Sequence, residues 1–182
     1  MSNQLRNLRK IPEKIYEQLI KFIGRFNHPL YMKHYVTFLK KCGMDIQTGD
    51  NAPIYIAINA SFDGKDFSKI HIGKDVVISG DVRVLTHDYS IARALQSIGV
   101  DMTKEAYLLK DVYIDENCFI GAKSILLPGT RIGKNVVVGA GSVVRGSIPD
   151  DSVVIGNPAT IIEKTSEYAK KHLERKDYKL NK

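Results

Sequence analysis

One histidine of the chain stands where it could do chemistry. His87 lies at the point where a regular six-residue pattern stops, and Asp88 follows it directly. Histidine is the side chain that most readily exchanges a proton near neutral pH, so it often serves as the general base of an active site. The alternative interpretation is that His87 only fills a turn. The other histidines are expected on outer surfaces or in the tail, and they are His28, His34, His71 and His172.

The six-residue pattern is the strongest structural signal in the sequence. Aliphatic residues occupy every sixth position in two runs, which are Ile72, Ile78 and Val84, then Ile114, Ile120, Leu126, Ile132, Val138 and Val144. A helix of about 3.6 residues per turn does not produce this period, and a sandwich needs turn signals every 8–12 residues or so. Each hexad therefore predicts one short strand and one turn. Three hexads make one triangular coil of a parallel β-solenoid, with the aliphatic residues pointing to its axis.

Residues suited to turns occur at a fixed place in the same period. Three positions after the aliphatic residue stand Asp75, Asp81, Asn117, Lys123, Asn135 and Gly141. Aspartate, asparagine and glycine favour tight turns. These positions are therefore expected at the corners of the coils.

The repeat is interrupted between the two runs. The expected aliphatic positions there hold Ser90 and Gln96, so residues 88–110 are expected to leave the coil as an extruded loop with a helical turn around 91–97. A loop that interrupts a rigid scaffold creates a concave place on it and is a frequent carrier of function. The break therefore places the candidate chemistry at His87.

The segments on either side of the repeat are predicted to be helical. A first helix is expected from Pro12 to Gly24 and a second from Pro29 to Gly43, with an aromatic face that packs on the body or on a neighbouring subunit. We divide the chain into a helical segment (1–43), a β-helix domain (44–162) with the loop 88–110, and a basic C-terminal helix or tail (163–182). The alternating Ile54, Ile56 and Ile58 predict a strand at the start of the domain.

The net charge of +7 comes from the two ends of the chain rather than from its body. Residues 1–41 hold nine Lys or Arg and two Glu, whereas residues 42–162 hold eleven Lys or Arg and fourteen acids. The body lacks the basic and aromatic stripe of nucleic-acid-binding proteins, so a solvated helix face is the favoured explanation. The sequence shows neither a secretory signal nor a run of apolar residues that could span a membrane. Two distant cysteines favour a reducing, cytoplasmic compartment.

Several segments together resemble one known family. The stretch Val84-Leu85-Thr86-His87-Asp88-Tyr89-Ser90 resembles the active-site segment of the hexapeptide-repeat O-acetyltransferases, especially those that modify bacterial surface polysaccharides. The runs 115–122, 127–129 and 139–144, then Ile148-Pro149 and Gly156-Asn157-Pro158-Ala159, are similar to later segments of that family. The resemblance covers about residues 44–163. It implies a mainly β fold, a left-handed parallel β-helix with N-terminal helices and a C-terminal helix.

The resemblance also implies a reaction and a set of site residues. His87 would be the general base that deprotonates a sugar hydroxyl for direct attack on acetyl-CoA, and no metal is required. Asp88, which could equally cap the loop, and Asn59 would contact the acceptor. The residues expected along the coenzyme groove are Ala122, Ala140, Arg145, Asn157, Pro158 and Lys164. Members of the family form homotrimers with sites between subunits, which implies the same here.

Two positions depart from the family pattern. Thr160 and Glu163 stand where basic residues are frequent, so Lys164 or the basic tail is expected to take over the contacts to the coenzyme phosphates.

Three other functions remain open from the sequence. A zinc-dependent carbonic anhydrase of the same fold would need three histidine ligands, and the body holds only His71 and His87. A non-enzymatic scaffold has no need of the interrupted repeat with His87 at the break. N-acetylation of an amino sugar or small amine would use the same base, so the sequence does not separate it from O-acetylation.

Overall fold

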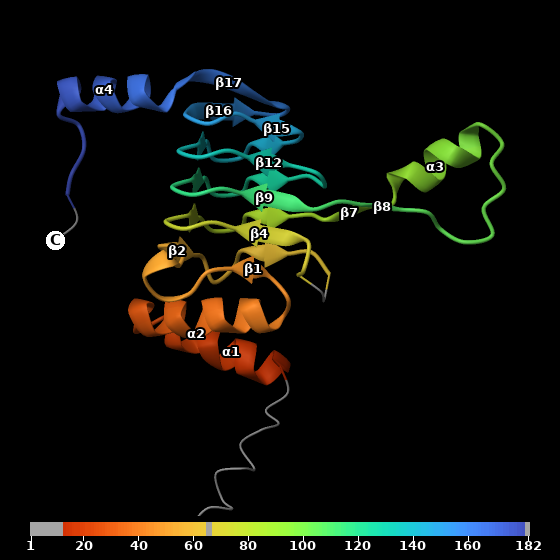
Figure 1. Ribbon diagram of the computed structural model, residues 1–182, viewed down its shortest axis with the longest axis horizontal. Coiled ribbons are helices and arrows are strands. Elements are labelled where there is room, and N and C mark those ends of the chain that lie inside the picture. Colours follow the sequence, from red (N-terminus) through yellow and green to blue (C-terminus); the bar gives the residue numbers. More distant parts are fainter. Residues whose placement is uncertain (1–12, 65–66, 181–182) are drawn as a thin grey trace, which may run out of the picture.

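The computed structural model describes residues 13–64 and 67–180, and its body is a triangular solenoid of short parallel strands (Figure 1). The first sheet contains β1 (Asp45–Ile46), β4 (Ile70–Ile72), β9 (Val112–Ile114), β12 (Arg131–Ile132) and β15 (Ser147–Ile148). The second contains β2 (Tyr55–Ile56), β5 (Val77–Ile78), β10 (Phe119–Ile120), β13 (Val137–Val138), β16 (Ser152–Gly156) and β17 (Ala159–Lys164). The third contains β3 (Ser61–Phe62), β6 (Arg83–Val84), β11 (Ile125–Leu126) and β14 (Val143–Val144).

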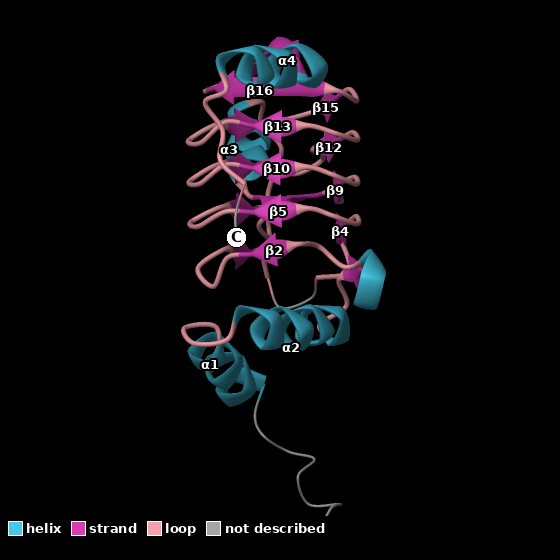
Figure 2. Cartoon of the chain, turned by 90° about the vertical axis from the view of Figure 1, so that its left-hand side faces the viewer, coloured by secondary structure: helices cyan, strands magenta, loops and turns pink. Residues whose placement is uncertain are grey.

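The chain visits the three sheets in the same order in every coil, which defines three edges of the solenoid. The first edge joins the first and second sheets and includes residues 73–75, 115–117 and 133–135. The second edge joins the second and third sheets and includes residues 79–81, 121–123 and 139–141. The third edge leads from the third sheet back to the first and includes residues 85–87, 127–130 and 145–146. In Figure 2 the second sheet faces the viewer.

The aliphatic hexad positions form the core, as the sequence predicts. All nine are at most 3% exposed, and the register pairs them coil upon coil, for example Ile78 with Ile120 and Ile120 with Val138. The same stacks continue beyond the two runs into Ile56 and Val154. The sequence pattern does not show these outer members because the spacing between coils changes at both ends.

The corner positions adopt the left-handed backbone that tight turns require. The six predicted residues, Asp75, Asp81, Asn117, Lys123, Asn135 and Gly141, have φ between 56° and 72°. Side chains along the first edge also bond to one another, because Asn117 donates to Asn135 and Asn135 donates to Asp151, both at 2.8 Å. Gly121 is required by close packing, since a Cβ there would lie 2.5 Å from the backbone nitrogen of Ala140.

Two helices close the first end of the solenoid. They are α1 (Glu13–Ile23) and α2 (His28–Lys41), and the predicted start of the first at Pro12 lies outside the described residues, as does the basic segment before it. The aromatic face of α2 packs on the body. The hydroxyl of Tyr31 donates to the backbone oxygen of Ile56 at 2.9 Å, and burial raises the pKa of that tyrosine.

The other end of the solenoid is closed by a hairpin and a helix. The strand β17 runs antiparallel to β16, and α4 (Thr165–Arg175) projects from it to one side of the body (Figure 1). A single turn of 3-10 helix, Gly49–Asn51, lies between β1 and β2. Among the described residues no helix is both long and apolar enough to cross a membrane.

Candidate active site

The loop predicted between the two runs is an arm that leaves the body at the third edge. It begins as a two-stranded antiparallel ribbon of β7 (His87–Asp88) and β8 (Leu108–Leu109), and α3 (Ser90–Ser97) lies at its far end (Figure 1). Arg93 of α3 forms an ion pair with Glu105 of the returning segment. His87 is therefore the first residue of the arm, held by strand pairing on one side and by the rigid coil on the other.

The side chain of His87 pairs with a carboxylate that the sequence analysis did not single out. Its Nδ1 lies 2.5 Å from Oδ2 of Asp63. The same oxygen accepts backbone hydrogen bonds from Thr86 at 3.0 Å and from His87 at 3.1 Å. The Asp63 side chain is only 14% exposed, whereas that of His87 is 34% exposed. A carboxylate fixed by two backbone donors holds the imidazole in one orientation, and in the neutral ring it favours the tautomer with Nδ1–H toward Asp63 and the lone pair on Nε2.

The two residues belong to successive coils on the same edge. Asp63 follows β3 and His87 comes shortly after β6, and the two strands are paired through Phe62 and Val84. The segment 60–69 does not follow the hexad period, so the sequence offers no register that would align Asp63 with His87. The only trace of this pairing in the sequence is that an acidic residue, Asp63, directly follows the aromatic residue Phe62 at the end of β3.

His87 opens into a small cavity with aromatic walls. Its volume is about 260 Å³, and its lining comprises Asp63, Gly64, Lys69, Thr86, His87, Tyr89, Tyr107 and Leu109. The rings of Tyr89 and Tyr107 stand nearly perpendicular to the imidazole, with centroids 5.4 and 6.4 Å from it. Both tyrosines are about half exposed. The cavity thus offers a base and two aromatic rings to a polar substrate, while the ammonium of Lys69 in its wall is paired with Asp111 at 2.9 Å.

Asp88 has a local hydrogen bond at the start of the arm. Its Oδ1 accepts from the backbone N–H of Ser90 at 2.8 Å, and this hydrogen bond lowers the pKa of the carboxyl group. Such a bond from an aspartate to the residue two positions on is a common turn-forming contact. The carboxylate is solvent-exposed, and its predicted role as an acceptor contact stays a prediction.

Most of the other sequence-predicted residues lie on a different edge from His87. Asn59, Ala122 and Ala140 all lie along the second edge, where Asn59 donates to Asp81 at 2.8 Å. Asn157 and Pro158 form the turn between β16 and β17, at the end of β16 that reaches this same edge. The third sheet separates the row from His87 within one chain. The structure therefore groups these five residues with one another and not with the base.

Comparisons with known proteins agree with this architecture. A model of the bacterial transferase hexapeptide repeat (six repeats) matches residues 111–146. The galactoside O-acetyltransferase of Lactococcus lactis is 34% identical over 146 residues, which cover 71% of this chain and 67% of that protein. The chain belongs to the hexapeptide-repeat acetyltransferase family.

Two further members of the family are similar over different spans. Escherichia coli WbbJ, named as a lipopolysaccharide-biosynthesis O-acetyl transferase, is 37% identical over 98 residues, which cover 52% of this chain and 50% of WbbJ. The solved structure of a galactoside acetyltransferase in complex with coenzyme A superposes with a TM-score of 0.55 at 21% identity, covering 93% of this chain and 88% of that one. This likeness identifies the fold as the left-handed β-helix of the family. The chain spans only about half the length of WbbJ.

Two basic residues predicted to meet the coenzyme lie apart from the row on the second edge. Arg145 follows β14 on the third edge, two coils beyond His87, and it is exposed. Lys164 ends β17 opposite Ser152, at the far end of the hairpin from Asn157. Glu163, which departs from the family pattern, is paired with Lys171 of α4 at 2.7 Å. The tail thus supplies a cation that offsets the acidic substitution.

The histidines do not form a metal site with one another. His71 lies on the outer face of the first sheet, where its Nδ1 faces Asp45 at 3.0 Å and its Nε2 faces Asp111 at 3.2 Å. Its ring stacks on Tyr113. Within residues 13–64 and 67–180 no group of three or more histidine, cysteine or acidic side chains could hold a metal ion. This part of the chain therefore offers no support for the zinc enzyme considered from the sequence.

Proposed function

We propose that this acyltransferase moves the acetyl group of acetyl-CoA to a hydroxyl of a sugar that belongs to a surface polysaccharide or its precursor. The observation that carries the proposal is the Asp63–His87 pair, in which a carboxylate orients an imidazole that lines an aromatic-walled cavity. Tyrosine rings combine an apolar face with a hydroxyl, which suits the mixed surface of a sugar. Similarity to relatives named for galactoside and lipopolysaccharide acetylation supports this acceptor class.

The reaction needs one proton transfer and one displacement. Nε2 of His87 takes the proton of the acceptor hydroxyl as its oxygen attacks the thioester carbonyl. An O–C bond forms, the C–S bond of the thioester breaks, and the imidazolium returns its proton to the departing thiolate. Asp63 keeps Nδ1 protonated and stabilises the positive charge that the ring carries between the two transfers.

We infer from the separation of the edges that each site is shared between two copies of the chain. His87 ends the coil of β4, β5 and β6. On the second edge, Asn59 lies one coil before this level and Ala122 one coil after it. A three-fold axis parallel to the solenoid relates the copies without changing the height of any coil. His87 of one copy would therefore face the second edge of the next copy at a height between those of Asn59 and Ala122. The acceptor would then meet Asn59, and the coenzyme would extend past Ala122 and Ala140 toward Asn157.

Coenzyme binding along this edge would use backbone amide groups rather than long side chains. Ala122 and Ala140 follow one another on successive coils, and the backbone oxygen of Ala122 already accepts from Gly141 at 2.8 Å. Small side chains there permit close approach of a pantetheine arm to backbone amides. Lys164 and Arg145 would supply cations to the phosphates, from this copy or from its neighbour.

Thiol release from acetyl-CoA tests the proposed reaction. We expect release that depends on an added acceptor, in a panel of galactosides, nucleotide sugars and amino sugars. Product mass and alkali lability then distinguish an O-acetyl ester from an N-acetyl amide. Release with amino sugars alone, giving an alkali-stable product, would contradict O-acetylation in favour of the alternative considered from the sequence.

A subunit-mixing experiment tests the shared site. His87→Ala removes the base, and Ala140→Trp blocks the second edge at an exposed position, so each protein alone should be nearly inactive. Co-expression in equal amounts should restore about a quarter of the wild-type activity, because one site in four then combines an intact base with an intact edge. Activity that stays near zero in the mixed trimers would contradict a site shared between copies.

A further inference from the structure

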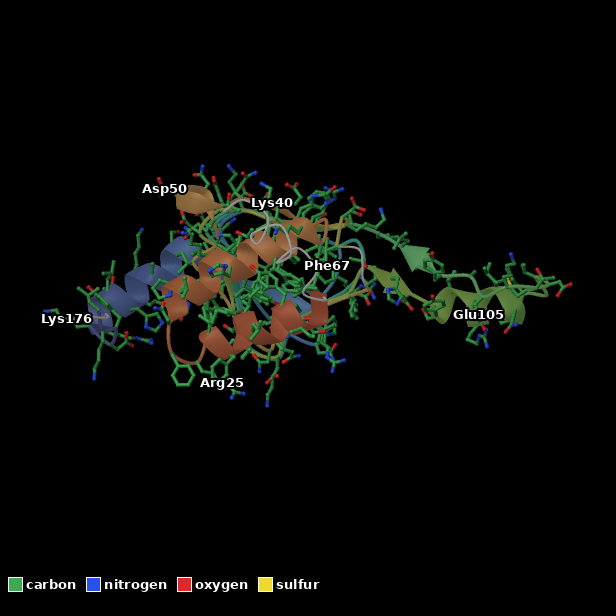
Figure 3. The ribbon with its side chains drawn as sticks, turned by 90° about the horizontal axis from the view of Figure 1, so that it is seen from below. Arg25, Lys40, Asp50, Phe67, Glu105 and Lys176 are labelled. Atoms are coloured by element: carbon green, nitrogen blue, oxygen red, sulfur yellow. The ribbon has the colours of Figure 1, made fainter. Side chains whose placement is uncertain are left out.

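A second, larger cavity lies between the N-terminal helices and the first coil. Its volume is about 610 Å³, within the range of pockets that hold small organic ligands. Its walls are mostly apolar, with Tyr35, Phe38 and Leu39 from α2, and Phe62 and Phe67 from the coil. Figure 3 looks at this end of the molecule and shows Phe67 beside the helices, on the side from which the arm leaves.

This cavity adjoins the site at His87. Gly64 lines both cavities, and the preceding residue is Asp63, the partner of His87. At its other end the larger cavity includes Asn59, on the second edge. It therefore runs below the third sheet from the edge that carries the base to the edge that is proposed to meet the acceptor. A group attached to a sugar at His87 would therefore have this cavity beside it.

The charges in the wall point to an uncharged occupant. Glu17 and Lys21 are paired at 2.7 Å, and they neutralise one another at the side formed by α1. Among the described residues the remaining polar lining consists of an amide, a thiol and two hydroxyls, from Asn59, Cys42, Ser61 and Tyr35. An anionic or cationic ligand would have no unpaired partner among these side chains, whereas an apolar group gains from each methylene that it buries.

We propose that this cavity binds the apolar aglycone of the acceptor, so that the substrate is a glycoside that carries an alkyl, aryl or lipid group next to the sugar that is acetylated. The proposal rests on the proposed function for the position of the sugar at His87. It also gives α1 and α2 a part in substrate selection, because they supply one wall of the cavity.

Paired acceptors test the proposal by kinetics. Methyl and octyl β-galactosides share a sugar and differ by seven methylenes, and the methyl and octyl β-glucosides form a second pair. Each buried methylene is worth a factor of about four, so two or more should raise kcat/KM of the octyl compound at least about tenfold over the methyl compound. Equal kcat/KM values within both pairs would overturn the aglycone site while leaving the acetyl transfer itself intact.

A filled cavity provides the matched variant. Cys42 is a half-buried residue in the cavity wall, and Ser147 is an exposed strand residue on the first sheet, outside it. Cys42→Phe should bring the octyl-to-methyl ratio to within about threefold of one, whereas Ser147→Phe should keep the wild-type ratio. An octyl-to-methyl ratio of kcat/KM near one in both variants would contradict the assignment to this cavity.

Cysteine modification gives a readout that does not depend on turnover. Cys42 is half-buried in the cavity wall, while Cys118 is 2% exposed and its pKa is raised by burial to about 11. N-ethylmaleimide should therefore modify Cys42 first. Octyl galactoside below its micelle concentration should slow the rate of Cys42 modification at least about fivefold, whereas methyl galactoside should leave that rate unchanged. An unchanged rate would overturn the proposal, as would a Cys42 that is unreactive because a second copy covers it. Protection without turnover of either glycoside would retain the aglycone site and contradict the proposed function instead.

Discussion

His87→Gln should lower kcat for acetyl transfer by about 10²- to 10⁴-fold, because a positioned general base contributes a rate factor of that size. Glutamine retains a planar polar end but does not take up the proton of an alcohol. The fold should be unchanged, since His87 is one-third exposed and lies outside the stacked core. Initial rates of thiol release at saturating acetyl-CoA and acceptor measure the effect, and the melting temperature shows whether the solenoid is intact.

The matched control for this variant is His71→Gln. That histidine is also partly exposed and also faces carboxylates, but it lies on the first sheet, where Asp45 and Asp111 hold it and Tyr113 stacks on it. Its replacement should lower the melting temperature and leave kcat within about twofold. If His71→Gln reduced kcat as strongly as His87→Gln, general-base catalysis by His87 would be refuted.

The repeating part of the fold could be predicted because every coil poses the same steric problem. A core that stacks Ile120 on Ile78 needs an aliphatic side chain at each sixth position, and a corner with positive φ needs a residue such as Asn117 that tolerates it. Both demands are local, so they leave a periodic trace in the sequence. The arm is predictable for the same reason, since Ser90 and Gln96 interrupt the aliphatic period.

The candidate site could be predicted only where the repeat itself marks it. The partnership of Asp63 and His87 depends on how two irregular segments end on neighbouring coils, and a period of six carries no information about that register. The separation of His87 from Ala122 likewise follows from the order of the sheets, which becomes visible once the edges are assigned. Spacing along the chain therefore nominates His87 as a base and small residues such as Ala122 on an edge, and their roles stay predictions, but it gives no account of their relative placement.

Asp63→Asn should lower kcat by about 10- to 100-fold with little change in KM for either substrate. The asparagine keeps an oxygen for the backbone N–H groups of Thr86 and His87, so the local fold is retained. It removes the negative charge that stabilises the imidazolium, and its amide N–H₂ competes to face Nδ1, which favours the tautomer without a lone pair on Nε2. Asp63 is thus a positioning residue, which acts on the reaction through His87.

A double-mutant cycle separates this role from a structural one. In the His87→Gln background, Asp63→Asn should cost less than about twofold further in kcat, because the group that it positions is already absent. A residue that merely supported the cavity would lower the activity of both backgrounds by the same factor, and equal factors would therefore refute the assignment. Unchanged dissociation constants for coenzyme A across the four proteins would show that the coenzyme edge is intact. The coupling between the two substitutions can then be attributed to the 2.5 Å contact between the carboxylate and Nδ1.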